Sequence, residues 1–291
     1  MENKDLIWVY NYKKAYSLLM VFTVLWIFFV VYDYTIISQR PSILYQPIWM
    51  FQKIFMPHPV SNVLFYVVAV SSLALSIYNI YKKNIISSLL LFLGVLWLNA
   101  IKWNYGCTSA VGHTFVLAHL FSIIVPSFSF LSKKLNIYDS YSVKVSLIGV
   151  LVTYSMAGFW KFLSLAKTIY TKNFDQVSWL HSDAVELNAI VGRRSLDNTV
   201  SEFMFNAYQI PYFWEVATVL VFAVQLTAVL AVFSRVYASF VLLILVCFHL
   251  FNTFFNDVVF NVAPAVLLIL LFPYHTFFKK DYLAFKDNLV R

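Results

Sequence analysis

The chain has 291 residues, of which 61% are hydrophobic, 19% aromatic and only 12% charged, with a formal net charge of +8. This composition excludes an ordinary soluble domain, because a soluble core of this size cannot bury so many phenylalanines and tyrosines. Several apolar runs approach the roughly 20 residues that span a bilayer, and they are continuous rather than alternating, which also excludes a β-barrel. Because the basic residues lie in loops between these runs, the positive charge indicates membrane topology and not nucleic-acid binding.

The apolar runs predict an all-α polytopic membrane protein with about eight transmembrane helices in a single domain over 1–291. The predicted spans are 15–33, 61–80, 85–101, 112–131, 143–163, 213–233, 236–254 and 258–273. Two connections are long: a segment at 34–60 that is rich in proline and aromatic residues, and an excursion at 164–212. The first run lacks a small-residue cleavage site after it, so we expect a retained span and not a signal peptide.

Lysine and arginine are distributed unevenly over the short loops. The side that carries both termini holds most of them, which predicts cytoplasmic termini in the cell membrane. In the excursion, Ser182 is placed to cap a helix at 183–191 that stops at Gly192, and a second helix is expected at 197–208. Both expected helices have one apolar and one polar side, so we expect them to form an external lid that lies in the interface plane.

The stretch 147–167 carries the strongest candidate for chemistry. Tyr154, Gly158 and Lys161 fall at i, i+4 and i+7, so they share one helix face, and the glycine predicts that this face packs against a neighbouring helix. An amine kept from water on such a face can act as a base. The alternative is that Lys161 lies near the helix end and snorkels to the membrane interface.

The predicted orientation brings several polar residues to the external level of the bilayer. They come from four spans: Lys161, His113, Asn99, and His249 with Asn252. Polar residues within spans are candidates for function, so these groups are expected to share a site; alternatively each is a separately satisfied packing group. His113 and His119 are six residues apart and point away from each other on a helix, so no metal site is predicted, and His119 is expected to be a buried hydrogen-bonding group.

Three motifs of the sequence resemble those of a known family, in the same order along the chain. Residues 157–161 (AGFWK) look like the Ala-Gly-x-x-Lys element of the vitamin K-dependent gamma-carboxylase and its bacterial relatives, the HTTM (horizontally transferred transmembrane domain) proteins. Residues 248–252 (FHLFN) are similar to the late Phe-His-x-x-Asn span of that family, and His113 lies where the family has a histidine at the head of a span. The likeness covers nearly the whole chain as a membrane domain.

The resemblance implies roles for these residues. Lys161 would be the base that deprotonates a reduced quinone of the vitamin K hydroquinone type, and His113 would assist chemistry at the same site. His249 would line the pocket, and we assign Asn252, Tyr154 and Asn99 to substrate binding with it. In the carboxylase, oxygen converts the quinol to a stronger base that abstracts a proton from a glutamate side chain.

The chain departs from the family in two respects. The family follows the lysine with a tryptophan and then a glycine, whereas here the next tryptophan is Trp179. The sequence also has no counterpart of the large propeptide-binding region, so we do not expect it to carboxylate protein glutamates alone. The alternative function is a non-catalytic or partner-dependent membrane component for maturation or export of a secreted peptide. A small-molecule transporter is a third hypothesis, disfavoured because no repeats or carboxylates deep within spans are found.

Overall fold

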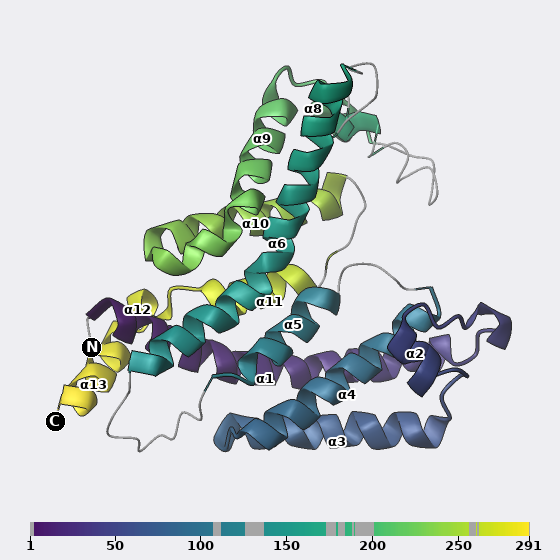
Figure 1. The fold of residues 1–291 in the computed structure, drawn as a ribbon, viewed down its shortest axis with the longest axis vertical. Coiled ribbons are helices and arrows are strands. Elements are labelled where there is room, and N and C mark those ends of the chain that lie inside the picture. The colour runs from purple at the N-terminus through teal and green to yellow at the C-terminus, as the bar shows by residue number, and fades with distance from the viewer. Residues whose placement is uncertain are drawn as a thin grey trace. The chain divides into compact units, whose positions relative to one another are not determined.

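The computed structural model describes residues 3–106, 112–125, 137–172, 179, 184–187, 189, 201–255, 260 and 262–290, and every regular element among them is a helix (Figure 1). The chain divides into two compact units, Met1–Leu147 with Ile269–Arg291, and Ile148–Leu268. Two helices, α6 (Ile137–Thr171) and α11 (Val262–Leu271), contribute residues to both units. The assignment of 1–291 to one domain stays a prediction.

The first unit is a set of packed apolar helices. They are α1 (Asn3–Ile37), α3 (Asn62–Tyr81), α4 (Ile85–Asn104) and α5 (His113–Ser122). α3 packs against both α1 and α4, and α4 packs against α5 (Figure 1). Ser61 caps α3 by accepting a hydrogen bond from the backbone nitrogen of Leu64 at 3.3 Å, and Asn84 caps α4 in the same way with Ser87 at 2.8 Å. The turn between α3 and α4 has only three residues, Lys82 to Asn84, and the Asn84 cap begins α4 directly after it.

His119 lies in the interior of the first unit. Its Nε2 is 3.0 Å from Oγ1 of Thr23 on α1, and both side chains are buried. Because the Thr23 hydroxyl donates to the carbonyl of Leu19 at 2.6 Å, the imidazole is the donor between the two side chains. The expected role of His119 as a buried hydrogen-bonding group is confirmed.

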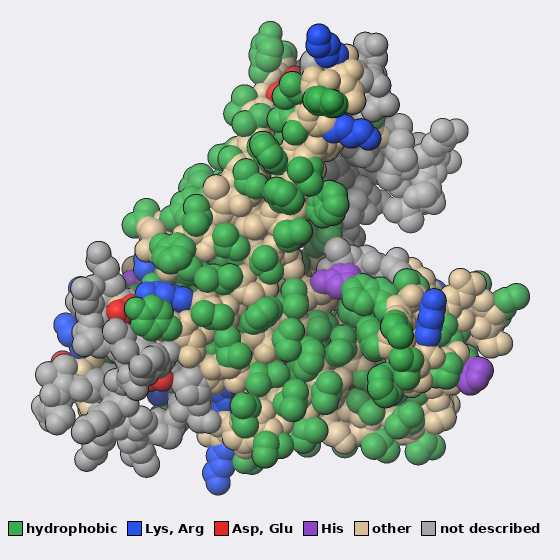
Figure 2. Space-filling model, viewed as in Figure 1, with side chains coloured by type: hydrophobic (Ala, Val, Ile, Leu, Met, Phe, Trp, Pro, Cys, Tyr) green, Lys and Arg blue, Asp and Glu red, His purple; other side chains and the backbone are tan. Residues whose placement is uncertain are grey.

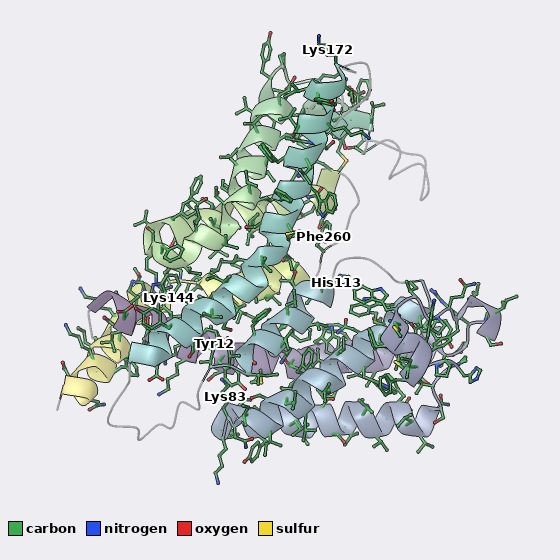
Figure 3. The ribbon with its side chains drawn as sticks, in the orientation of Figure 1. Tyr12, Lys83, His113, Lys144, Lys172 and Phe260 are labelled. Atoms are coloured by element: carbon green, nitrogen blue, oxygen red, sulfur yellow. The ribbon has the colours of Figure 1, made fainter. Side chains whose placement is uncertain are left out.

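Lys83, which lies in the turn between α3 and α4, caps the C-terminal end of α5 (Figure 3). Its amine donates to the carbonyl of Ser122 at 2.8 Å and to that of Val125, and lies 4.8 Å from the ring centroid of Tyr16. Carbonyls at a helix C-terminus have no partner within the helix, so a lysine is a suitable donor there. Burial lowers the pKa of Lys83 to about 7.

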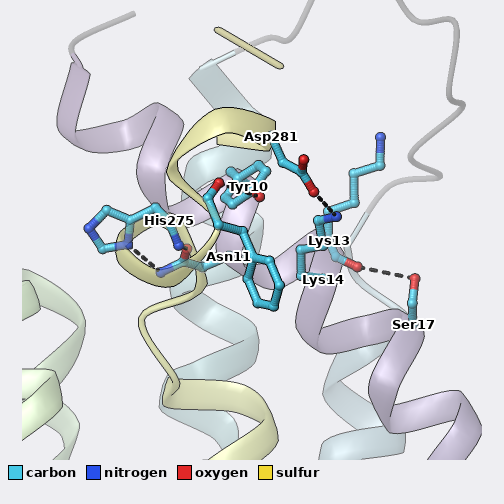
Figure 4. Close-up of polar contacts among 8 residues, drawn as sticks. Tyr10, Asn11, Lys13, Lys14, Ser17, His275 and Asp281 are labelled. Carbon is cyan, nitrogen blue, oxygen red and sulfur yellow. Dashed lines mark hydrogen bonds and ion pairs between the residues drawn. The ribbon is translucent and has the colours of Figure 1, made fainter. Parts of the chain in front are cut away.

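Both ends of the chain pack together in the first unit. Two short helices, α12 (Tyr274–Phe277) and α13 (Lys279–Val290), lie against α1. Figure 4 shows the contact: the backbone nitrogen of His275 donates to Oδ1 of Asn11 at 2.9 Å, and Asn11 Nδ2 lies 3.2 Å from His275 Nδ1. Lys14 pairs with Asp281 at 3.2 Å beside this contact.

The second unit contains a sharp bend and a break. Its further elements are α8 (Glu202–Tyr208), α9 (Phe213–Leu226), η3 (Ala228–Phe233) and α10 (Arg235–Phe255). α8 and α9 meet at 74°, and Tyr212 between them takes the left-handed conformation with φ 60°. α9 packs against α10, and Trp214, Tyr208 and Ala189 form a small buried core.

Five described helices are long and apolar enough to cross a membrane: α1, α3, α4, α6 and α10. The number becomes six if the bent pair α8–α9 is one span, so the predicted count of eight is not confirmed. The predicted span 213–233 is interrupted after Leu226, and α5 and α11 have only ten residues each, although parts of 112–131 and 258–273 lie outside the described residues. Hydrophobic side chains cover much of the visible surface of the first unit, as integral membrane proteins require (Figure 2).

The expected lid helices are described only in part. Residues 184–187 and 189 are helical, and α8 begins at Glu202 instead of residue 197. The remaining residues of the expected helices at 183–191 and 197–208 lie mostly outside the described ranges. The lid therefore stays a prediction.

Candidate functional site

Gly158 brings the backbones of α6 and α9 into contact in the second unit. A Cβ built on Gly158 would lie 2.4 Å from the backbone nitrogen of Leu226 and 2.6 Å from its Cα. One turn earlier on α6, Ser155 Oγ accepts a hydrogen bond from the backbone nitrogen of Val229 at 3.2 Å. This hydroxyl satisfies a backbone group at the break between α9 and α10. The prediction that the Gly158 face of α6 is packed is confirmed.

Lys161 continues the same contact by one further turn of α6. Its amine donates to Oε1 of Gln225 at 2.9 Å, and Gln225 is only 4% exposed. The ring centroids of Phe248 and Trp179 lie 5.7 and 5.8 Å from the nitrogen, within the range of cation–π interaction. Trp179 also donates from its indole to the carbonyl of Lys161 at 3.2 Å. The lysine is thus held by groups of α9, α10 and the segment after α6, which is not the geometry of an amine extended freely toward headgroups.

Tyr154 and His249 form a second polar pair in this unit. The phenol oxygen lies 2.9 Å from Nε2 of the imidazole, and His249 is 4% exposed. The ring of Phe260 packs edge-on against the imidazole, with the ring centroids 5.0 Å apart. The other imidazole nitrogen, Nδ1, is buried and has no hydrogen-bond partner within the described part of the chain. A buried nitrogen of this kind is a candidate to bind a ligand or water.

Asn252 lies one turn beyond His249 on α10. Its amide nitrogen donates to the carbonyl of Phe248 at 2.8 Å within the same helix. The side chain is 8% exposed. This bond fixes the amide beside the His249 pair, and it leaves the assignment of Asn252 to substrate binding as a prediction.

His113 and Asn99 lie together in the first unit. The imidazole of His113 stacks on the indole of Trp103 with centroids 4.9 Å apart and rings 14° from parallel, and Trp49 stacks on both at 6.0 Å. Asn99 donates to the carbonyl of Val95 at 2.9 Å, and its Oδ1 would be 2.4 Å from a Cβ on Gly112, which allows the close approach of the residue before His113. The start of α5 is therefore held by an aromatic stack.

The predicted site residues form two groups. Tyr154, Lys161, His249 and Asn252 belong to the second unit, and Asn99 and His113 to the first. Within the second unit, Phe248 joins the two polar pairs, because its ring lies next to the Lys161 amine and it precedes His249 in the chain. The convergence of the two groups on one site stays a prediction. Metal-binding clusters of three or more suitable side chains are absent from the described residues.

The sequence reasoning missed Gln225, the partner of Lys161. The signal was present, because Gln225 carries the only carboxamide in the predicted span 213–233. A carboxamide inside an apolar run requires a hydrogen-bond partner, and the lysine at the packed face of another span was available. Trp179 gave no such signal, because it precedes the two expected helices of the excursion and lies outside any predicted element.

The helices and these buried polar pairs define an integral membrane protein with polar side chains packed between apolar helices. Comparisons of the chain with protein-family models, curated proteins and solved structures find no match.

Proposed function

We propose that the chain is a membrane enzyme of the HTTM type, in which the Lys161 amine removes a proton from a hydroxyl of a lipid-soluble aromatic compound. The observation that best supports this proposal is the partner of the amine, the neutral carboxamide of Gln225. A carboxylate partner would hold the lysine as an ammonium ion, whereas an amide oxygen accepts a hydrogen bond from either an ammonium ion or a neutral amine. The neutral amine is the form that accepts a proton.

The chemistry of the surrounding groups fits a reduced quinone. The rings of Phe248 and Trp179 lie within 6 Å of the amine, and aromatic faces suit a planar aromatic compound. Nδ1 of His249 lacks a partner among the described residues, so an oxygen of the compound would complete its hydrogen bonding. When bound, a reduced quinone would supply a weakly acidic hydroxyl and the electrons that reduce oxygen.

Each residue has a stated task in this proposal. Lys161 takes the hydroxyl proton, and Gln225 orients the amine. Tyr154 holds the His249 imidazole so that Nδ1 remains available. Apolar surroundings keep water from the amine, which favours proton transfer from the substrate over exchange with solvent. The family resemblance adds three roles to the proposal: His113 would assist, and Asn99 and Asn252 would contribute to substrate binding.

The test compares wild-type protein with Lys161→Arg in proteoliposomes supplied with a reduced naphthoquinone and oxygen, with quinone products measured by mass spectrometry. Arginine keeps the charge and cannot serve as a base, so the rate is expected to fall by about 10²–10⁴-fold. Lys167→Arg on the same helix, at an exposed position, is the matched control and keeps the wild-type rate. Equal rates for wild type and Lys161→Arg would refute the role of the lysine, and inactive wild type would refute the enzymatic assignment.

The alternative of a partner-dependent component for a secreted peptide makes a different prediction. It requires that Lys161→Arg support normal function in cells and that a partner co-purify with the chain. Location in the cell membrane with cytoplasmic termini is part of our proposal and rests on the distribution of basic residues. Reporter tags on both termini test it, since protease added outside intact cells should spare both tags.

A further inference from the structure

The connection between α1 and α3, residues 38–61, is folded onto the end of α4. It contains η1 (Ser42–Leu44) and α2 (Met50–Phe55). The backbone nitrogen of Gln46 donates to the carbonyl of Asn104 at 2.7 Å, and the Asn104 side chain donates to the Tyr45 hydroxyl at 2.8 Å. This hydroxyl in turn donates to the carbonyl of Met56 at 2.9 Å. These hydrogen bonds fix the connection to the rest of the first unit.

The inner and outer sides of the connection differ sharply. Gln52 is fully buried and its Oε1 accepts hydrogen bonds from two backbone nitrogens at the start of α2. Facing away, Ile43 is 79% exposed, Met50 78% and Phe55 76%. Large apolar side chains at this exposure have no protein cover within the described residues. Their apolar surface therefore has to meet another apolar phase or remain in water at a cost.

Charge on the connection is entirely basic. Residues 38–61 contain Arg40 and Lys53 and no Asp or Glu. Lys53 is exposed on α2, one position before Ile54, which is 59% exposed. A helix with exposed apolar side chains and lysine at the edge is typical of segments that lie in the membrane interface, where the basic groups reach lipid phosphates.

The exposed apolar surface continues onto the flanking helices. Ile36, just before the end of α1, is 51% exposed, and Val63, at the start of α3, is 76% exposed. Both helices are long and apolar enough to span a membrane. Because the connection joins the end of one such helix to the start of its packed neighbour, its apolar side lies at the level where these helices leave the bilayer.

We propose that the α1–α3 connection is an in-plane membrane anchor, with its outward apolar side chains inserted among the acyl chains of the adjoining lipid leaflet and its basic side chains at the phosphate level. This role is independent of catalysis at Lys161. It explains why the inner side is fixed by buried hydrogen bonds, since a rigid support holds the apolar side in the plane of the membrane.

The test uses spin labels in a chain in which Cys107 and Cys247 are replaced by serine, reconstituted in vesicles of phosphatidylcholine and phosphatidylglycerol. Labels are placed by Met50→Cys and Phe55→Cys on the apolar side, and by Lys53→Cys at its edge. Collision rates are measured with oxygen, which concentrates in hydrocarbon, and with a nickel complex that stays in water. All three positions are exposed, so the substitutions do not disturb packing, and unfolding temperatures verify this.

Two positions provide the reference values. Val70→Cys on α3, where the native side chain is 62% exposed, reports the lipid phase, and Lys82→Cys in an exposed turn reports water. Labels at 50 and 55 are expected to match Val70 with oxygen collisions several-fold above nickel collisions, and the label at 53 is expected to fall between the references. Values at 50 and 55 that match Lys82 overturn the proposal. Low rates with both reagents also overturn it, because they mean that another protein or a second copy covers this side.

Discussion

Substituting Gly158 by alanine tests the contact that orders the second unit. The added Cβ would lie 2.4 Å from the Leu226 nitrogen, and ordinary van der Waals contact begins at 3.4 Å, so α6 and α9 must separate by about 1 Å. The obstacle is backbone and cannot rotate away. Such overpacking costs about 1–3 kcal/mol. The same displacement would lengthen the 2.9 Å bond between Lys161 and Gln225 beyond hydrogen-bonding range.

Reversible unfolding of the purified protein in detergent measures this cost. The matched control is Gly94→Ala on α4, where the added Cβ would meet Oγ of Ser72 at 2.2 Å. That obstacle is the end of a small side chain that can turn, so the loss of stability is expected to be smaller than for Gly158→Ala. A Gly158→Ala protein as stable as wild type, or no less stable than Gly94→Ala, would show that the two helices are not in backbone contact.

Three further predictions concern buried polar groups. Because burial lowers the Lys83 pKa to about 7 from its ordinary 10.5, the unfolded chain binds more protons than the folded chain between these pH values, and the free energy of unfolding rises with pH there. Lys83→Met should flatten this rise. An unchanged slope would contradict the burial of the Lys83 amine. Tyr154→Phe leaves Nε2 of His249 unpaired and should lower the free energy of unfolding by about 1–3 kcal/mol. Tyr170 is 88% exposed on the same helix, so Tyr170→Phe should cause no measurable change in the same unfolding experiment. Asn11→Ala removes the two hydrogen bonds between Asn11 and His275 and should make the C-terminal helices cleavable by protease at lower temperature. Unchanged cleavage would argue against a stabilising role for these bonds.

Hydropathy predicted the bounds of several helices closely, and it failed where tertiary contacts determine where a helix is interrupted. The predicted spans 61–80 and 236–254 correspond to α3 (Asn62–Tyr81) and α10 (Arg235–Phe255). The interruption of 213–233 was not predictable, because the freed backbone nitrogen of Val229 is satisfied by Ser155, a residue of another helix. Hydropathy reports the solvent preference of side chains and carries no information about such a partner.

In the candidate site too, local spacing was predictable from the sequence and tertiary partners were not. Helical spacing correctly predicted that Gly158 marks a packed face, since i, i+4 and i+7 periodicity is a local property. The partner of Lys161 depends on which helix lies opposite, and spacing within one helix cannot identify it. Likewise, the position of His113 at the start of α5 was predicted, but its stacking on Trp103 and Trp49 requires the docking of a distant segment.

The bond between Lys161 and Gln225 has a consequence for biosynthesis. The two residues are 64 positions apart, and at about 5–20 residues per second the ribosome needs about 3–13 s to reach the glutamine after the lysine. During this interval Gln225 is not yet available to the amine, and a lysine within hydrocarbon is costly. The later part of α6 is therefore expected to wait at the bilayer surface, and to enter fully only when α9 emerges from the translocation machinery. Membrane insertion of one helix would thus be timed by the synthesis of another.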